Sequence, residues 1–146
     1  MKSLIPTISV ADIETTLAFY NQMLGFETTY TLPGPGGRLV YAGVRRGASE
    51  LMIGTLDRDP DVQRDCLGAG VSFYFTVDAD EDIDAYFDRV KLAGAPVFQE
   101  PTDQFWGHRD WGITDPDGYK LIISKETHAV DWSQWVPERE LIGSAD

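Results

Sequence analysis

Residues 105–123 read FWGHRDWGITDPDGYKLII, and this stretch predicts the β-hairpin from which the rest of the fold can be worked out. At its centre, Asp115-Pro116-Asp117-Gly118 places Asp, Pro and Gly at the first, second and fourth positions of a type I turn. Gly118 can adopt the positive φ that closes such a turn with a G1 bulge. The residues on either side of the turn are therefore expected to form two antiparallel strands.

The bulge determines which residues of the hairpin face one another. The expected pairs are Thr114 with Lys120, Gly112 with Ile122 and Asp110 with Ser124. One face is then wholly apolar and belongs to the core, with Trp111, Ile113, Leu121 and Ile123. The opposite face is polar and follows on from Trp106 and His108. A two-residue turn would shift the register by one residue and mix the two faces, so the pattern favours the bulge. We expect the polar face, dented at Gly112, to line a pocket.

Length and composition limit the class of protein. The 146 residues suffice for one domain, or for two small modules that share a core, and 42% hydrophobic with 25% charged residues is typical of a soluble globular chain. A net charge of −12 disfavours nucleic acid and anionic membranes as partners and favours a cationic ligand. The single Cys66, the lack of a lipid-spanning run and the lack of a signal peptide lead us to expect a cytoplasmic protein without an internal disulfide.

Outward from the hairpin, the chain repeats one order of elements. The first half shows a strand at 4–10, a helix from Asp12 to a stop at Gly25, a strand at 26–32, a loop at 33–37 and a hairpin at 39–53. The second half shows a strand at 71–77, a helix at 80–93 stopped by Gly94, a short strand at 95–99, a loop at 100–103 and the closing hairpin. The matching order, more than any residue match, indicates an internal repeat.

This repeat predicts an α+β fold of two tandem βαβββ modules in one structural domain. The modules are expected at residues 1–56 and 71–125, with a linker at 57–70 and a C-terminal tail at 126–146. Because neither sheet can bury both of its faces alone, we expect a curved mixed sheet around a concave trough, with the helices on its outer face. Such a trough is where a ligand site is expected.

Two motifs carry a resemblance to a known family. Val10-Ala11-Asp12-Ile13, together with Ala18-Phe19-Tyr20 and Leu24-Gly25-Phe26, resembles the first module of the vicinal oxygen chelate superfamily, which groups glyoxalases, extradiol dioxygenases and bleomycin-resistance proteins. Residues 106–111, followed by 115–118, resemble the closing hairpin of its bleomycin-resistance branch. The resemblance covers residues 1 to about 125 in element order, and it implies the fold more firmly than any one activity.

The enzymes of this superfamily hold a divalent metal with inward side chains, typically His or Gln, a carboxylate, His and Glu. The resemblance places those positions on Ile5, Glu50, Ser72 and Ile122. Only Glu50 is a good ligand, whereas a catalytic site needs about three protein ligands and an open position. The resemblance therefore implies no metal site and no cofactor, and it argues against glyoxalase-type isomerisation and dioxygenase chemistry. His108 and His128 stay open as alternative ligands.

The residues expected to line the trough combine aromatic rings with polar groups. They are Tyr30, Tyr41, Glu50, Met52, Ser72, Tyr74, Trp106, His108, Asp110 and Ile122. Trp106 could stack on a planar ligand or fill a dimer interface, and Asp110 could act as a general base if its pKa were raised. On the core face of the same strand, Arg109 is expected to pair with a helix acid.

Three functions are compatible with these features. The leading hypothesis is a cytoplasmic, metal-free homodimer that sequesters a planar or cationic aromatic compound such as a toxic antibiotic, as the bleomycin-resistance proteins do between subunits. The second is a divergent metal-dependent lyase, isomerase or dioxygenase that uses Glu50. The third is a module whose trough binds a protein. In the tail, Trp132 and Trp135 could extend a dimer contact.

Overall fold

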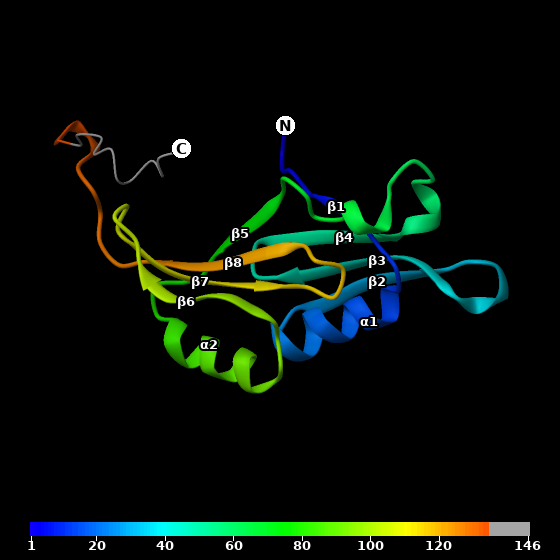
Figure 1. The fold of residues 1–146 in the computed structure, drawn as a ribbon, viewed down its shortest axis with the longest axis horizontal. Coiled ribbons are helices and arrows are strands. Elements are labelled where there is room, and N and C mark those ends of the chain that lie inside the picture. The colour runs from blue at the N-terminus through cyan, green and yellow to red at the C-terminus, as the bar shows by residue number, and fades with distance from the viewer. Residues whose placement is uncertain (135–146) are drawn as a thin grey trace.

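The computed structural model describes residues 1–134, in which the order β-α-β-β-β occurs twice (Figure 1). The first module contains β1 (Thr7–Val10), α1 (Ile13–Ala18), β2 (Glu27–Pro33), β3 (Leu39–Arg46) and β4 (Ser49–Thr55). The second contains β5 (Ser72–Thr76), α2 (Ile83–Leu92), β6 (Val97–Asp103), β7 (His108–Thr114) and β8 (Lys120–Glu126). A π-helical turn, Phe19–Met23, prolongs α1, and short 3₁₀ turns lie at Pro35–Gly37, Leu56–Arg58, Arg64–Cys66 and Trp132–Gln134. The predicted α+β fold of tandem modules is confirmed.

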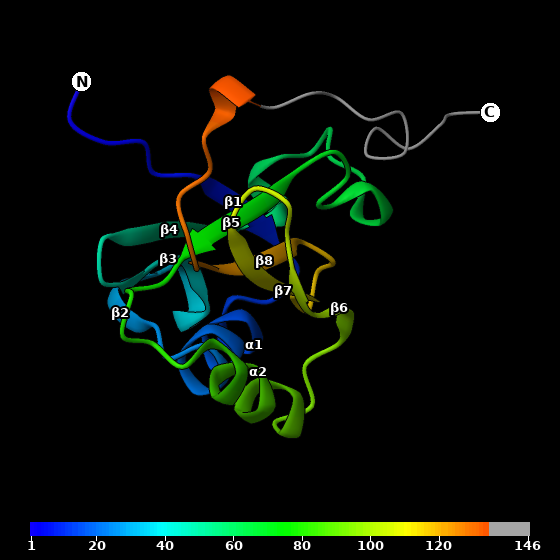
Figure 2. The ribbon, with the colours of Figure 1, turned by 90° about the vertical axis from the view of Figure 1, so that its left-hand side faces the viewer.

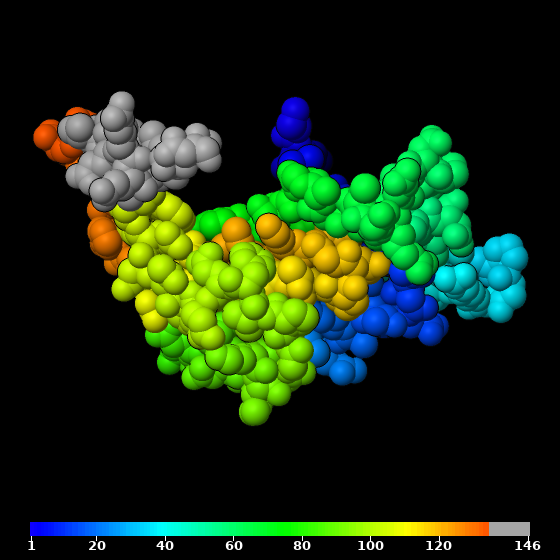
Figure 3. Space-filling model, in the orientation of Figure 1, coloured from blue at the N-terminus to red at the C-terminus, as the bar shows by residue number. Residues whose placement is uncertain are grey.

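The strands form two four-stranded mixed sheets, in the orders β1-β4-β3-β2 and β5-β8-β7-β6. The first and last strands of each module run parallel, and the other neighbours run antiparallel. Helices α1 and α2 lie on one side of the two sheets, as the views in Figures 1 and 2 both show. We call the opposite side of the sheets the open face. Figure 3 shows the same elongated molecule in space-filling form.

The closing hairpin has the predicted register. Gly112 pairs with Ile122 and Asp110 pairs with Ser124. The Gly118 N–H donates to the Asp115 carbonyl at 3.0 Å, and Gly118 has a φ of 93°, as a type I turn with a G1 bulge requires. The Asp115 carboxylate also accepts the N–H groups of Asp117 and Tyr119 at 3.0 and 2.9 Å. The expected turn role of Asp115 is confirmed.

The core-facing side of this hairpin packs on α2. Trp111 is fully buried, its Nε1–H donates to the Ile83 carbonyl at 3.1 Å, and its ring meets Tyr86 and Phe87 at centroid distances of 5.2 and 5.6 Å. Arg109 forms the expected ion pair with a helix acid, at 2.9 Å from Asp84. The hairpin is therefore fixed to α2 on this side, while its polar side remains on the open face.

Side chains of both modules meet in one core. The Tyr86 hydroxyl donates to the Leu24 carbonyl at 2.7 Å, and the rings of Phe26 and Phe75 meet edge to face at 5.6 Å. These contacts join α2 and β5 to the end of the first helical segment. In the part of the chain that the structure describes, no helix is long and apolar enough to span a lipid bilayer.

Element boundaries differ from expectation mainly at β6. The predicted loop at 100–103 was wrong, because these residues continue the strand. Pro101 is tolerated because β6 is an edge strand and because its pairing shifts between Gln99 and Thr102, where no regular ladder bond is required. Helix α2 begins at Ile83, later than predicted, because the Asp82 carboxylate caps it by accepting the Ala85 N–H at 3.0 Å.

Candidate functional site

The ten expected site residues fall into two groups, one on each sheet. The first sheet carries Tyr30 on β2, Tyr41 on β3, and Glu50 and Met52 on β4. The second carries Ser72 and Tyr74 on β5, His108 and Asp110 on β7, Ile122 on β8 and Trp106 just before β7. Strand alternation explains the placement on the fourth strand of each module: Leu51 and Leu121 point into the core, so their neighbours point to the open face.

A hydrogen-bonded cluster on the second sheet is centred on the Tyr74 hydroxyl. This oxygen lies 2.6 Å from Ser124 Oγ, accepts the Trp106 Nε1–H at 3.3 Å and lies 3.4 Å from both Asp110 Oδ2 and His108 Nδ1. His108 Nδ1 also lies 2.9 Å from Ser124 Oγ. We call these five residues the Tyr74 cluster. Their bonds fix the orientations of an indole, an imidazole and a phenol beside one another.

Asp110 is the buried anchor of the cluster, with only 2% of its surface exposed. Its Oδ1 accepts the Nε2–H groups of Gln99 at 2.5 Å and Gln104 at 2.7 Å, while Oδ2 accepts the Tyr74 hydroxyl. These bonds compensate the burial of the carboxylate. The geometry favours a positioning role for Asp110 over the role of general base.

Sequence reasoning missed Gln99, Gln104 and Ser124 as members of the site. Ser124 was assigned to the correct face, opposite Asp110, and that pairing was the signal that could have found it. Gln99 lies where the pairing of β6 shifts, so alternation along the strand does not give its direction. Gln104 follows β6 in a loop segment that has no periodic pattern.

The dent predicted at Gly112 is filled. A Cβ atom at Gly112 would clash with the ring of Phe98 from the neighbouring strand β6. Two glycines of the first sheet show the same arrangement, with Gly43 beneath Tyr30 and Gly54 beneath Arg58. Only the expected dent at Gly112 is corrected, because a flat side chain from the adjoining strand occupies that space. That the polar face lines a pocket stays a prediction.

The group on the first sheet is a stacked pair of tyrosines beside a charged pair. The rings of Tyr30 and Tyr41 lie 6.3 Å apart with planes 11° from parallel, and the Arg58 guanidinium lies 4.5 Å from the Tyr41 ring. Partial burial raises the pKa of the Tyr30 phenol, and the nearby Tyr41 and Glu50 raise this pKa further. The hydroxyl therefore stays neutral at physiological pH. The Glu50 carboxylate is paired with Arg45.

The side chains at the superfamily's metal positions do not suit a metal. Ile5 and Ile122 have no donor atom, Ser72 offers only a hydroxyl, and the Glu50 carboxylate faces a guanidinium. Elsewhere, His128 Nδ1 lies 3.2 Å from the Thr127 hydroxyl. Across residues 1–134, no set of three or more His, Cys, Asp or Glu side chains is arranged to hold an ion. The donor chemistry thus does not fit the metal that the fold can carry.

Each sheet carries its own part of the candidate site. Within the described residues, neither a hydrogen bond nor a ring contact joins the Tyr30–Tyr41 pair to the Tyr74 cluster. Tyr30 and Tyr74 are 39% and 44% exposed, so each group keeps aromatic surface available.

Comparison with known proteins places this fold in a family. The sequence profile of the Glyoxalase/Bleomycin resistance protein/Dioxygenase superfamily matches residues 5–123. Uncharacterized protein Rv0887c of Mycobacterium tuberculosis is 29% identical over 142 residues, which cover 90% of this chain and 79% of that protein.

Solved structures agree with the profile. A superfamily member from Sphaerobacter thermophilus superposes with a TM-score of 0.71 at 24% identity, covering 86% of this chain and 98% of the other. A glyoxalase/bleomycin resistance protein from Streptomyces sp. CB03234 superposes with a TM-score of 0.61 at 25% identity, covering 82% and 96%. The chain belongs to the Glyoxalase/Bleomycin resistance protein/Dioxygenase superfamily.

Proposed function

We propose that this protein is a cytoplasmic, bleomycin-resistance-like binding protein that sequesters a planar aromatic, preferably cationic, small molecule on its open face without a metal. The observation that carries the proposal is the Tyr74 cluster. It combines aromatic surface with polar groups whose positions are already fixed, while the superfamily's metal positions hold side chains that do not suit a metal.

The cluster suits recognition of a flat ring with polar edges. Trp106 and Tyr74 are held by their mutual hydrogen bond, so little side-chain entropy remains to be lost when a ligand stacks on them. The hydroxyl of Tyr74 and the imidazole of His108 offer polar atoms at the edge of that surface. The net charge of −12 attracts a cationic ligand over longer range.

A homodimer would bring the two groups together. In a two-fold pair, the first sheet of one subunit can face the second sheet of its partner, so that the Tyr30–Tyr41 stack and the Tyr74 cluster line one site. Exposed apolar side chains on the open face, among them Leu32 and Phe98, support such a contact.

We expect light scattering to give a particle of twice the 16.3 kDa chain mass at micromolar concentration. Leu32→Glu should convert it to a monomer, because each subunit would bury an unpaired carboxylate against the second sheet of its partner. Leu92→Glu is the matched control, since Leu92 is 90% exposed on the helix side and should not affect association. A wild-type particle of one chain mass would contradict the dimer.

Binding is tested by calorimetry and tryptophan fluorescence with acridinium and quinolinium compounds as planar cations. Trp106→Ala should weaken the best binder roughly 2- to 12-fold, because stacking contributes about 0.5–1.5 kcal/mol beyond buried area. Leu92→Ala should bind like the wild type, and EDTA should change nothing. If no planar cation binds, or if EDTA abolishes binding, the proposal is wrong and a metal-dependent activity becomes the better hypothesis.

A further inference from the structure

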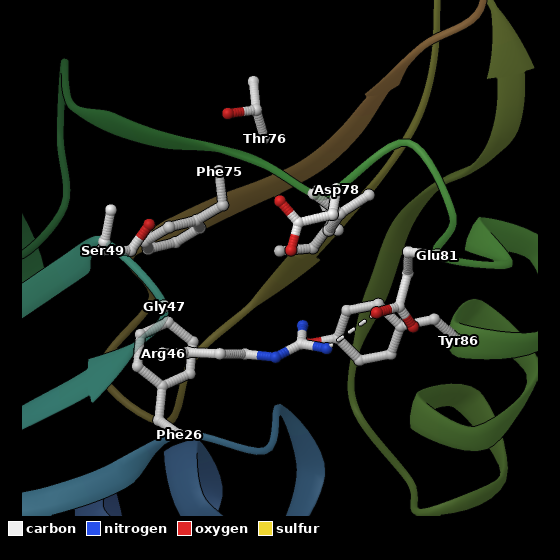
Figure 4. Close-up of a pocket in the computed structure, with 12 residues that line it drawn as sticks. Phe26, Arg46, Gly47, Ser49, Phe75, Thr76, Asp78, Glu81 and Tyr86 are labelled. Carbon is white, nitrogen blue, oxygen red and sulfur yellow. Dashed lines mark hydrogen bonds and ion pairs between the residues drawn. The ribbon is translucent and has the colours of Figure 1, made fainter.

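We infer that the junction of the two modules holds a second small-molecule site, distinct from the open-face site, which takes a neutral phenol with a neighbouring carbonyl acceptor. A cavity of 260 Å³ lies there, between the β3–β4 turn and the segment that follows β5 (Figure 4). Its walls include Phe26, Arg46, Ser49, Phe75, Thr76 and Asp78. This volume lies below the roughly 300–1,000 Å³ of pockets for drug-sized ligands, so a fragment-sized molecule fits.

The internal repeat indicates what this cavity lacks. One buried pair in each closing hairpin serves as the reference point for comparing the two modules. It is Val44 with Leu51 in the first module and Ile113 with Leu121 in the second. Two pairs closer to the turn, Arg46 faces Ser49 in the first hairpin. At the corresponding place in the second hairpin, Asp115 faces Tyr119, whose carbonyl accepts the Asp115 N–H at 3.0 Å. Ser49 therefore stands where the other module has Tyr119.

In the second hairpin, the side chains of Tyr119 and Asp117 form hydrogen bonds with backbone groups on the outer edge of β1. The Tyr119 hydroxyl donates to the Ser9 carbonyl at 2.9 Å, and its ring is buried beside Phe73 at a centroid distance of 6.1 Å. Asp117 Oδ1 accepts the Ala11 N–H at 2.9 Å. A phenol and a carbonyl-type oxygen thus occupy this edge together.

The outer edge of β5 presents one backbone carbonyl and one backbone N–H to the cavity. The Val77 N–H donates to the Ser124 carbonyl at 2.8 Å, so the peptide groups of Thr76 and Asp78 point away from β8 by strand alternation. Among residues 1–134, no side chain donates to the Thr76 carbonyl and no acceptor meets the Asp78 N–H. These groups correspond to the Ser9 carbonyl and the Ala11 N–H.

The charges around the cavity favour a neutral acceptor. The Arg46 guanidinium is held 3.1 Å from Glu81 and stacks 4.5 Å above the Tyr86 ring, and Figure 4 shows it extended along one wall. Asp78 itself contributes a carboxylate to the cavity lining, which disfavours a second anionic oxygen there. A 4-hydroxyphenyl amide meets these conditions: its hydroxyl can donate to Thr76, its carbonyl can accept from Asp78, and its ring can contact Phe75.

The test uses N-acetyltyrosinamide and N-acetylphenylalaninamide, which differ only in the hydroxyl, with amide NMR on the full-length protein. We expect N-acetyltyrosinamide to bind in the millimolar range with a shift of the Asp78 amide, and the hydroxyl-free probe to bind about fivefold more weakly for the loss of one hydrogen bond. Ser49→Tyr should fill the cavity, abolish binding and raise the melting temperature. Leu92→Ala, at an exposed position outside the cavity lining, is the control and should bind like the wild type.

The site is refuted if the two probes bind equally, if the Asp78 amide does not respond to about 10 mM probe, or if Ser49→Tyr binds as well as the wild type. The comparison of the two probes on the wild type decides the question even if Ser49→Tyr fails to fold. Trp106→Ala should leave this binding unchanged, so the outcome is independent of the proposed open-face function.

Discussion

Replacing Trp111 with Ala is expected to lower the free energy of unfolding by about 3–5 kcal/mol. The side chain is fully buried between β7 and α2, and its truncation removes ring contacts with Tyr86 and Phe87 and the hydrogen bond to the Ile83 carbonyl. The loss is a large share of the roughly 5–15 kcal/mol that stabilises a domain of this kind. Urea unfolding at neutral pH measures it directly.

Trp106→Ala is the matched control, because it removes the same side chain from the opposite face of the same hairpin. Trp106 is partly exposed, and its indole makes a hydrogen bond to Tyr74 and an edge contact with Phe105. Its truncation should therefore cost far less stability than that of Trp111. An equal loss in the two variants would show that the open face is as tightly packed as the core, which would contradict the placement of a ligand site there.

Asp115→Asn is expected to stabilise the protein above pH 6. It should also make the free energy of unfolding depend less on pH between pH 4 and pH 7. Burial raises the pKa of Asp115 from 3.8 to about 6, despite the N–H bonds from Tyr119 and Asp117 that favour the charged form. The folded state binds the Asp115 proton more tightly than the unfolded state does. The stabilisation that this proton gives to the folded state is therefore complete below pH 3.8 and is lost as the pH rises through about 6. The full difference is on the order of 3 kcal/mol.

The measurement compares urea unfolding of the wild type and Asp115→Asn at several pH values. Asn keeps an oxygen for the Asp117 and Tyr119 N–H groups but carries no charge, so the gap between the two proteins should widen from pH 4 to pH 7. Asp88→Asn, at an exposed position of α2, should show the same pH dependence of the free energy of unfolding as the wild type. If the gap does not change with pH, Asp115 does not carry the linked proton.

The sequence by itself determined the closing hairpin and the order of elements. The turn at 115–118 involves residues adjacent in the chain, and side-chain alternation from that turn places Trp111 in the core and Asp110 opposite Ser124 without any distant contact. The repeat of strand, helix and three strands likewise depends on local periodicity. For the same reason, the open-face positions of Tyr74, His108 and Asp110 could be assigned from the pattern alone.

Only the tertiary structure decided what meets these residues. Gln99 reaches Asp110 from an edge strand whose pairing shifts at Pro101, and Phe98 fills the space above Gly112 from that same strand. Irregular pairing breaks the two-residue alternation, so the sequence does not give the direction of these side chains. The junction cavity depends on how Ser49 of one module meets the edge of β5 in the other. Contacts between segments far apart in the chain are set by packing, which no local pattern encodes.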